Sequence, residues 1–261
     1  PARVNRGERP LYSVNDNEQP IVAIVRDKEA QSTRIELEFK KGKLPQPLRG
    51  TDAAYTMDLA MNLVCGMLNN RLQELVIKPD APFVGAGSYY GELVKEKDAF
   101  VAIYIAKLGQ EKQAYKDLLT QLEKMRRYGF THAELDRVKK EWLAAYEQAY
   151  NERTTVRNIQ RAQECIRHYL DGAPMPGEEW EFEMIQQLLP MIPVDVLNQV
   201  AQQWVTDHNL IIAFQAPIEA VLPTEAEAIE LLAAVKNEEI EAPVEEAIRE
   251  NLVETAPKAG K

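Results

Sequence analysis

Apolar residues recur along this chain at two spacings, one typical of strands and the other of helices. Ile21–Val25 is a short apolar run, and Thr33–Phe39 alternates apolar with charged side chains, the period of a strand buried on one face. Val84–Val94 and Ala99–Lys107 are extended segments joined by a short charged turn, so they predict an antiparallel hairpin. The second of them is apolar on both faces, which favours an interior position in a sheet. Leu210–Phe214 is the last strand that the pattern predicts.

Helical spacing begins at Thr51 and continues to Ile77, where Pro79 and Pro82 end the pattern. A second amphipathic helix is expected over Glu111–Tyr128, because its apolar residues fall on one side. Another helix follows it directly and is considered below. Four further helices are expected at Thr154–Leu170, Glu178–Leu189, Pro193–Val205 and Thr224–Val235.

The helix over Glu111–Tyr128 leads into the next helix through a turn of about three residues, which predicts a helical hairpin. Gly129 is placed to end the first helix, because helices commonly close on a residue with positive φ. Thr131 can cap the second helix, and Glu134 can reach back to the cap amide. Phe130 and Leu135 occupy the two positions of a hydrophobic staple. The stripe expected to be buried on the second helix comprises Leu135, Val138, Trp142, Ala145 and Ala149.

The order of these elements predicts an α+β fold, with a mostly antiparallel sheet covered on one face by helices. The regular alternation of strand and helix that marks a doubly wound sheet is missing. We expect three regions along the chain. Residues 1–19 form a polar N-terminal segment, residues 20–217 a single α+β domain, and residues 218–261 a capped helix followed by an acidic linker.

The net charge of −10 is concentrated at the C-terminal end. Residues 218–261 carry eleven acidic and four basic side chains, a balance of −7, which leaves −3 for the rest. Neither region is suited to binding phosphates, which argues against nucleic acid as a partner. No apolar run approaches the roughly 20 residues that cross a membrane, so no membrane insertion is expected. Because the sequence begins with Pro1 rather than Met, we expect a piece of a longer protein, whose compartment cannot be read from it.

Five residues could bind a metal through nitrogen or sulfur: His132, His168, His208, Cys65 and Cys165. None of the histidines belongs to an H-E-x-x-H or H-x-x-E-H motif, so no metallopeptidase zinc site is visible. Cys165 and His168, together with Glu164, come nearest to a site, but a structural zinc needs about four ligands. We expect a buried thiol and a surface imidazole there, and a solvent-exposed His132. The two cysteines make no disulfide framework, although a single bridge between them stays open.

The segment Gly85–Gly91 (GAGSYYG) resembles a phosphate-binding loop only loosely, because its last glycine is one place late for G-x-G-x-x-G. Glycines within a strand more often mark a bulge or a close backbone approach, and we favour that interpretation. Ser13, Ser32 and Ser88 lack the G-x-S-x-G setting of a nucleophile. The acidic residues lie mostly on solvated helix faces, so no acid–base pair can be named. The residues alone therefore predict no catalytic, cofactor-binding or metal-binding residue in this chain.

Six short segments carry a further signal when they are read together and in order. They are PIVAIVRDKEA (20–30), LNNRLQEL (68–75), PFVGAG (82–87), GFTHAELDRVK (129–139), YEQAYNER (146–153) and LLPMIP (188–193). Each alone is little more than a capping or packing signal. Together, over about residues 10–236, they resemble the pitrilysin/insulinase family of zinc peptidases, whose catalytic signature is H-x-x-E-H. The segment 129–139 is similar to the family pattern G-[FT]-T-x-x-E-L-x-x-x-K.

The resemblance implies that two related α+β domains form each of two lobes, and that the lobes close around a peptide. The family's zinc ligands lie in the first domain, and this chain looks like the second, non-catalytic domain of the N-terminal lobe. The signature H-x-x-E-H is absent from the sequence, so no catalytic residue is carried over. Arg71 and Glu74 are interpreted as structural. Zinc is expected in the catalytic domain of the full-length protein and not in this chain.

The function that we expect is therefore a non-catalytic wall of the substrate chamber in a bacterial zinc metallopeptidase, with this chain inactive alone. Its partners would be the neighbouring catalytic domain, the second lobe and the peptide substrate of the full-length protein. Two alternatives stay open. One is an inactive scaffold homologue used for assembly, as in mitochondrial processing peptidases, and the other is a stand-alone peptide-binding module that uses an open sheet edge. Family analogy favours a periplasmic or exported protein.

Overall fold

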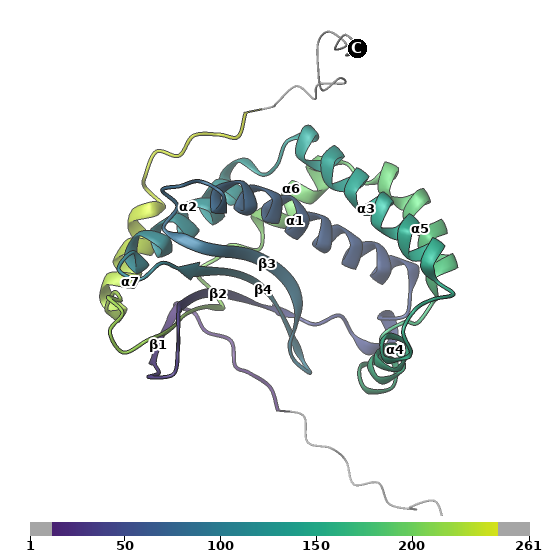
Figure 1. Ribbon diagram of the computed structural model, residues 1–261, viewed down its shortest axis with the longest axis horizontal. Coiled ribbons are helices and arrows are strands. Elements are labelled where there is room, and N and C mark those ends of the chain that lie inside the picture. Colours follow the sequence, from purple (N-terminus) through teal and green to yellow (C-terminus); the bar gives the residue numbers. More distant parts are fainter. Residues whose placement is uncertain (1–11, 245–261) are drawn as a thin grey trace, which may run out of the picture.

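The computed structural model describes residues 12–244, which form a five-stranded sheet with a layer of helices on one face (Figure 1). The strands are β1 (Ile21–Arg26), β2 (Thr33–Gly42), β3 (Phe83–Val94), β4 (Lys97–Ala106) and β5 (Leu210–Ala216). Their order across the sheet is β1-β5-β2-β4-β3. The β1–β5 pair is parallel, and the other neighbouring pairs are antiparallel. The predicted α+β fold is confirmed, and so is the interior position of β4.

The helices follow the predicted order, with differences at their ends. They are α1 (Asp52–Val76), α2 (Glu111–Tyr128), α3 (His132–Glu152), α4 (Asn158–Asp171), α5 (Glu178–Met191), α6 (Val194–Gln202) and α7 (Glu225–Val235), with a short 3-10 turn at Gln46–Leu48. α4 begins later than predicted, because Thr155 donates both its amide and its hydroxyl to the Glu152 carbonyl and so forms a separate turn. α5 continues past its predicted end, with Pro190 in its last turn.

The core lies between the sheet and the helices above it. On β2, Ile35, Leu37 and Phe39 are at most 1% exposed, and they alternate with residues that point to the opposite face. Leu37 is paired with Ile212 of β5, which is also buried. The ring of Phe39 stacks on that of Phe100 of β4, with 5.8 Å between ring centres. Full burial of one such side chain contributes about 1.5 to 3 kcal/mol to stability. The burial of these rows therefore holds this face of the sheet against the helices.

Two other helices hold the turn between α2 and α3. Gly129 has a φ of +64°, and a Cβ at this residue would lie 2.3 Å from the side chain of Asn198 on α6. The Asn198 amide group accepts a hydrogen bond from the Phe130 amide at 2.7 Å and donates one to the Phe130 carbonyl at 3.0 Å. From α1, Arg71 donates to the Gly129 carbonyl at 2.7 Å and to the Glu134 carboxylate at 2.8 Å. The turn is therefore fixed from both sides.

The predicted capping of α3 is confirmed. Thr131 accepts a hydrogen bond from the Glu134 amide at 3.3 Å, and the Glu134 carboxylate accepts one from the Thr131 amide at 2.7 Å. Phe130 and Leu135, the two residues of the predicted staple, are both buried.

The predicted buried stripe of α3 is correct only in its first half. Leu135 and Val138 are buried, but Ala145 and Ala149 are exposed. In the second half, α3 packs against α5 and not against the sheet, and Tyr150 stacks on an aromatic ring of α5 at 5.1 Å. Large aromatic side chains span the distance to this helix, so they take the inner side and the alanines are left outside.

The glycine-rich segment forms part of the edge strand β3, as predicted, with irregular pairing near both strand ends. Side chains of α1 occupy the outer edge of this strand. Asn69 accepts a hydrogen bond from the Ser88 amide at 2.6 Å and donates one to the Ser88 carbonyl at 3.0 Å. Gln73 donates to the Ala86 carbonyl at 2.9 Å. An added peptide strand would need these same backbone groups, so this part of the edge is closed to it.

α7 packs on α2 and beside β1, near the C-terminal end of the described chain (Figure 1). Thr224 and Glu227 form the capping box that the sequence predicts. The Tyr115 hydroxyl of α2 donates to the Ala228 carbonyl at 3.1 Å. The acidic linker predicted beyond this helix lies outside the described residues from residue 245 onward. Within residues 12–244, no helix combines the length and the apolar character needed to cross a membrane.

Candidate functional site: the uncovered face of the sheet

The histidines considered as metal ligands lie on different elements. His132 is exposed in the first turn of α3, as predicted. His168 Nδ1 lies 2.7 Å from the Ala173 carbonyl oxygen, and His208 Nδ1 lies 3.0 Å from the Glu18 carboxylate. In the part of the chain that the structure describes, no three histidine, cysteine, aspartate or glutamate side chains gather where they could hold a metal ion.

The two cysteines are free, and one of them is not where the sequence predicts it. Cys165 is exposed and not buried, because α4 carries it away from the core. Cys65 of α1 is buried, and this burial raises the pKa of its thiol to about 12. The thiol of Cys65 is therefore protonated at neutral pH and unsuited to nucleophilic chemistry.

The face of the sheet opposite the helices is uncovered and largely apolar (Figure 1). The strand register places nine apolar side chains on it, in rows shared by four strands. They are Ile21, Ala23 and Val25 on β1, Ile211 and Ala213 on β5, Val101, Ile103 and Ile105 on β4, and Tyr89 on β3. The exposed fraction is 55% at Val25 and 47% at Tyr89, on the two edge strands, but only 2% at Val101 on the interior strand β4. A broad apolar surface of this kind marks an interaction site.

A row of charged residues on β2 crosses this face. Arg34 donates two hydrogen bonds to Glu36, at 2.9 and 3.1 Å. Glu38 makes no ion pair within residues 12–244. Its partial burial, and next the charge of Glu36, raise the pKa of the Glu38 carboxyl above its ordinary value, although Arg34 acts in the opposite direction. A carboxylate among apolar side chains is costly unless it is paired, so a cationic group on a docked surface would stabilise Glu38.

α4 presents a second apolar surface. Its helical period places Ile159, Ile166 and Leu170 on one stripe, and all three are exposed. Figure 1 shows this helix beside the main body and not on the sheet. Apolar residues arranged in this way on an exposed helix are typical of a surface that another element covers.

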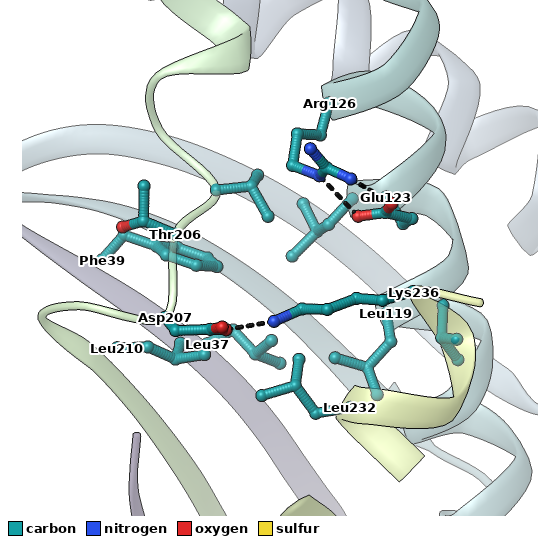
Figure 2. A pocket seen from close by; sticks show the side chains of 13 residues that line it. Leu37, Phe39, Leu119, Glu123, Arg126, Thr206, Asp207, Leu210, Leu232 and Lys236 are labelled. Atoms are coloured by element: carbon teal, nitrogen blue, oxygen red, sulfur yellow. Dashed lines mark hydrogen bonds and ion pairs between the residues drawn. The ribbon is translucent and has the colours of Figure 1, made fainter. Parts of the chain in front are cut away.

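A cavity of about 260 Å³ lies between α2, α7 and the sheet (Figure 2). Its apolar walls consist of Leu37, Phe39, Leu119, Leu122, Val205, Leu210, Leu232 and Val235. Two ion pairs lie among these walls: Arg126 donates to Glu123 at 2.7 and 2.6 Å, and Lys236 reaches Asp207 from the end of α7.

The charged groups of this cavity bind one another, so they are not available for chemistry. Burial acts to raise the pKa of Glu123, but hydrogen bonds from Arg126 and Arg127 hold that pKa below its ordinary value. Glu123 is therefore ionised and committed to its arginines. The Lys236–Asp207 pair joins the end of α7 to the loop before β5. The cavity is best explained as a gap in the packing of α7 against α2 and the sheet.

Comparison with known proteins shows which proteins have a similar sequence or structure. No family model matches the chain. A zinc protease PQQL-like protein of Arabidopsis thaliana is 23% identical over 253 residues, which are 96% of this chain and 23% of that protein. The first half of the periplasmic protease PqqL from Escherichia coli superposes with a TM-score of 0.81 at 17% identity, over 92% of this chain and 52% of that one. A predicted insulinase family protease from Yersinia pestis gives 0.74 at 11% identity, over 88% and 50%.

The chain has the fold of the pitrilysin/insulinase peptidases. The resemblance carried by the six segments is thereby confirmed. The chain spans about a quarter of the curated zinc protease that it matches, and about half of the solved first half of PqqL. It therefore corresponds in length to one part of each of these relatives.

The uncovered face is not predicted from the sequence, although one segment contains a pattern that indicates it. The segment Ala99–Lys107 is apolar on both faces, and this served only to predict an interior strand. An interior strand with one face on the core needs apolar residues on the other face only if something covers that face as well. The double pattern was thus also a signal for a docking surface.

Proposed function

We propose that this chain is a non-catalytic domain of a zinc metallopeptidase and forms part of the wall of its substrate chamber. The observation that carries the proposal is the match along 96% of this chain to a zinc protease of which the chain spans only 23%. The absence of H-x-x-E-H from the sequence supports the non-catalytic role. Zinc then belongs to the catalytic domain of the full-length protein, which also binds the peptide substrate.

In this proposal the uncovered face of the sheet packs against the neighbouring catalytic domain. The apolar rows on β1, β4 and β5 supply the contact area, and Glu38 receives a cationic group from that neighbour. The exposed stripe of α4 meets a further part of the same protein, and the acidic segment after α7 links the two lobes. Because PqqL is a periplasmic protease, we also propose that the parent of this chain is exported.

Zinc content and peptide hydrolysis test the proposal when they are measured on this chain and on its full-length parent. We expect the parent to bind zinc and to lose activity with a chelator, and this chain alone to do neither. Tightly bound zinc and chelator-sensitive hydrolysis in the isolated chain would contradict the non-catalytic role. A parent without zinc or activity would instead show that the chain belongs to an inactive scaffold.

A further inference from the structure

A groove lies on the helical side of the molecule, so it is independent of the docking face proposed above. Its volume is about 860 Å³, and it is lined by α1, α2, the first half of α3 and the segment Pro243–Val244. Pockets that bind ligands commonly measure about 300 to 1,000 Å³, so this groove is large enough for several residues of a peptide.

The three acidic side chains of the groove are already paired with its two arginines. Arg71 binds Glu134 through both Nε and Nη2. Arg137 donates to Glu74 at 2.8 Å and to Glu141 at 3.2 Å. These five charges therefore bind one another and leave no carboxylate for other cations.

Three lysines of the groove remain without an anion. Lys78 lies in the turn after α1, Lys124 on α2 and Lys140 on α3, and their ammonium groups make no hydrogen bond or ion pair within residues 12–244. Lys78 acts on Asp117 only at longer range, and the Asp117 carboxylate accepts the Tyr104 hydroxyl at 3.0 Å. With two arginines and three lysines against three glutamates, the groove carries a net charge of +2.

Arg71 adds a donor that lacks an acceptor. Its Nε and Nη2 are hydrogen-bonded, but its Nη1 is buried and has no partner among the described residues. Buried N–H groups are nearly always paired, so this one indicates a position where an acceptor is missing. Arg71 lines the groove, so a carboxylate bound there would supply the acceptor once the arginine side chain turns toward it.

The segment after α7 is held in place and contributes Pro243 and Val244 to one side of the groove. Arg127 donates to the carbonyls of Lys236 and Glu238, each at 2.8 Å, and the Tyr128 hydroxyl donates to the Ile240 carbonyl at 2.9 Å. These bonds hold residues 236–240 along the end of α2 and so position Pro243 and Val244 at the groove. A bound peptide would lie between Pro243 and Val244 on one side and α1 and α3 on the other.

We propose that this groove binds an acidic peptide segment of a partner polypeptide. Its carboxylates would pair with Lys78, Lys124 and Lys140, and one oxygen would reach Arg71. The lysines come from three separate segments, so an extended segment with several carboxylates uses them better than one compact anion. Since the chain carries a net charge of −10, its surface repels an acidic peptide overall, and attraction is confined to regions such as this groove.

The probe is a fluorescein-labelled hexaglutamate peptide, titrated with the whole chain while anisotropy is recorded at low salt. We expect saturable binding that weakens with added salt. Lys124→Glu combined with Lys140→Glu should weaken it about tenfold or more, because two attractions become two repulsions. Lys28→Glu combined with Arg167→Glu, the same charge change outside the groove, should have a smaller effect. None of these four side chains forms an ion pair or hydrogen bond within residues 12–244, so circular dichroism should show both variants folded.

A further variant separates the partner from the acidic end of the chain itself. In it, Glu245, Glu246, Glu250 and Glu254 are changed to glutamine in the whole chain. Binding by the unchanged chain that depends on Lys124 and Lys140 supports the proposal. Binding that is absent, or equally weakened by the two pairs of substitutions, overturns it. Binding that appears only in the glutamine variant also overturns it, because the groove then belongs to the chain's own acidic residues.

Discussion

At the scale of single residues, Glu134 links α1 to the start of α3. It caps its own helix through the Thr131 amide and binds Arg71 of α1. Arg71 in turn holds the Gly129 carbonyl and lies 4.4 Å from the centre of the Phe130 ring. Burial acts to raise the pKa of Glu134, but Arg71 and the Thr131 amide lower it below its ordinary value of 4.5. The carboxylate is therefore ionised in the folded protein and stabilises it.

Glu134→Gln should lower the free energy of unfolding at neutral pH by about 2 to 3 kcal/mol, because the partly buried Arg71 loses its charged partner. Glutamine still fits the capping box, so the helix start is kept. A group whose pKa is lowered by folding stabilises fully above its ordinary pKa and loses this effect as the pH falls through the folded value. The difference between the two proteins should therefore shrink as the pH falls below 4.5.

Urea unfolding at neutral and at acidic pH measures this effect. Glu74→Gln is the matched control, since its ion pair with Arg137 is exposed and should contribute less than about 1 kcal/mol. Equal losses in the two variants, or a loss that does not change with pH, would show that Glu134 acts by some route other than its charge.

At the scale of elements, the junction of α2 and α3 depends on the absence of a side chain at Gly129. Gly129→Ala should cost about 3 kcal/mol or more, because a Cβ at positive φ costs roughly 1 to 2 kcal/mol and the displaced Asn198 would lose two hydrogen bonds. Gly109→Ala is the control, since Gly109 has a φ of +80° but no atom within 4 Å of an added Cβ. Thermal unfolding of both variants separates backbone strain from the lost contact. A similar loss in both would exclude a role for Asn198.

Local chemistry was predictable from the sequence, and the choice of packing partner was not. The cap at Thr131, the turn at Gly129 and the strands follow from residues close together in the chain, and the structure has them as predicted. The prediction that Ala145 is buried on α3 is wrong. The buried face of this half of α3 is determined by α5, which comes later in the chain. The predicted burial of Cys165 is wrong for a related reason. An amphipathic pattern predicts that one helix face will be covered, but the apolar stripe of α4 is exposed in this chain.

At the scale of the whole molecule, the same limit applies to function. The absence of H-x-x-E-H and the six ordered segments could be read directly, and they predicted the peptidase resemblance that the comparisons confirm. The docking face and the basic groove could not be predicted from the sequence, since each is assembled from segments far apart in the chain. Ile21 and Ile103 share one face only because of the register in which β1, β5, β2 and β4 pair, and Lys78 and Lys140 share one groove only because α1 packs beside α3.

The uncovered face of the sheet yields the last prediction. Val25 and Tyr89 are already exposed, and they lie on the two edge strands, β1 and β3, where lysine is well tolerated. Val25→Lys combined with Tyr89→Lys should therefore change the free energy of unfolding by less than about 1 kcal/mol. The same pair should greatly reduce co-purification of this chain with the catalytic domain of its parent, because each lysine would be buried at the contact without a partner. Leu108→Lys, at a residue 67% exposed outside this face, should leave the association intact. If Leu108→Lys disrupted the association and the other pair did not, the neighbour would have to bind outside this face, and the apolar rows would need another explanation.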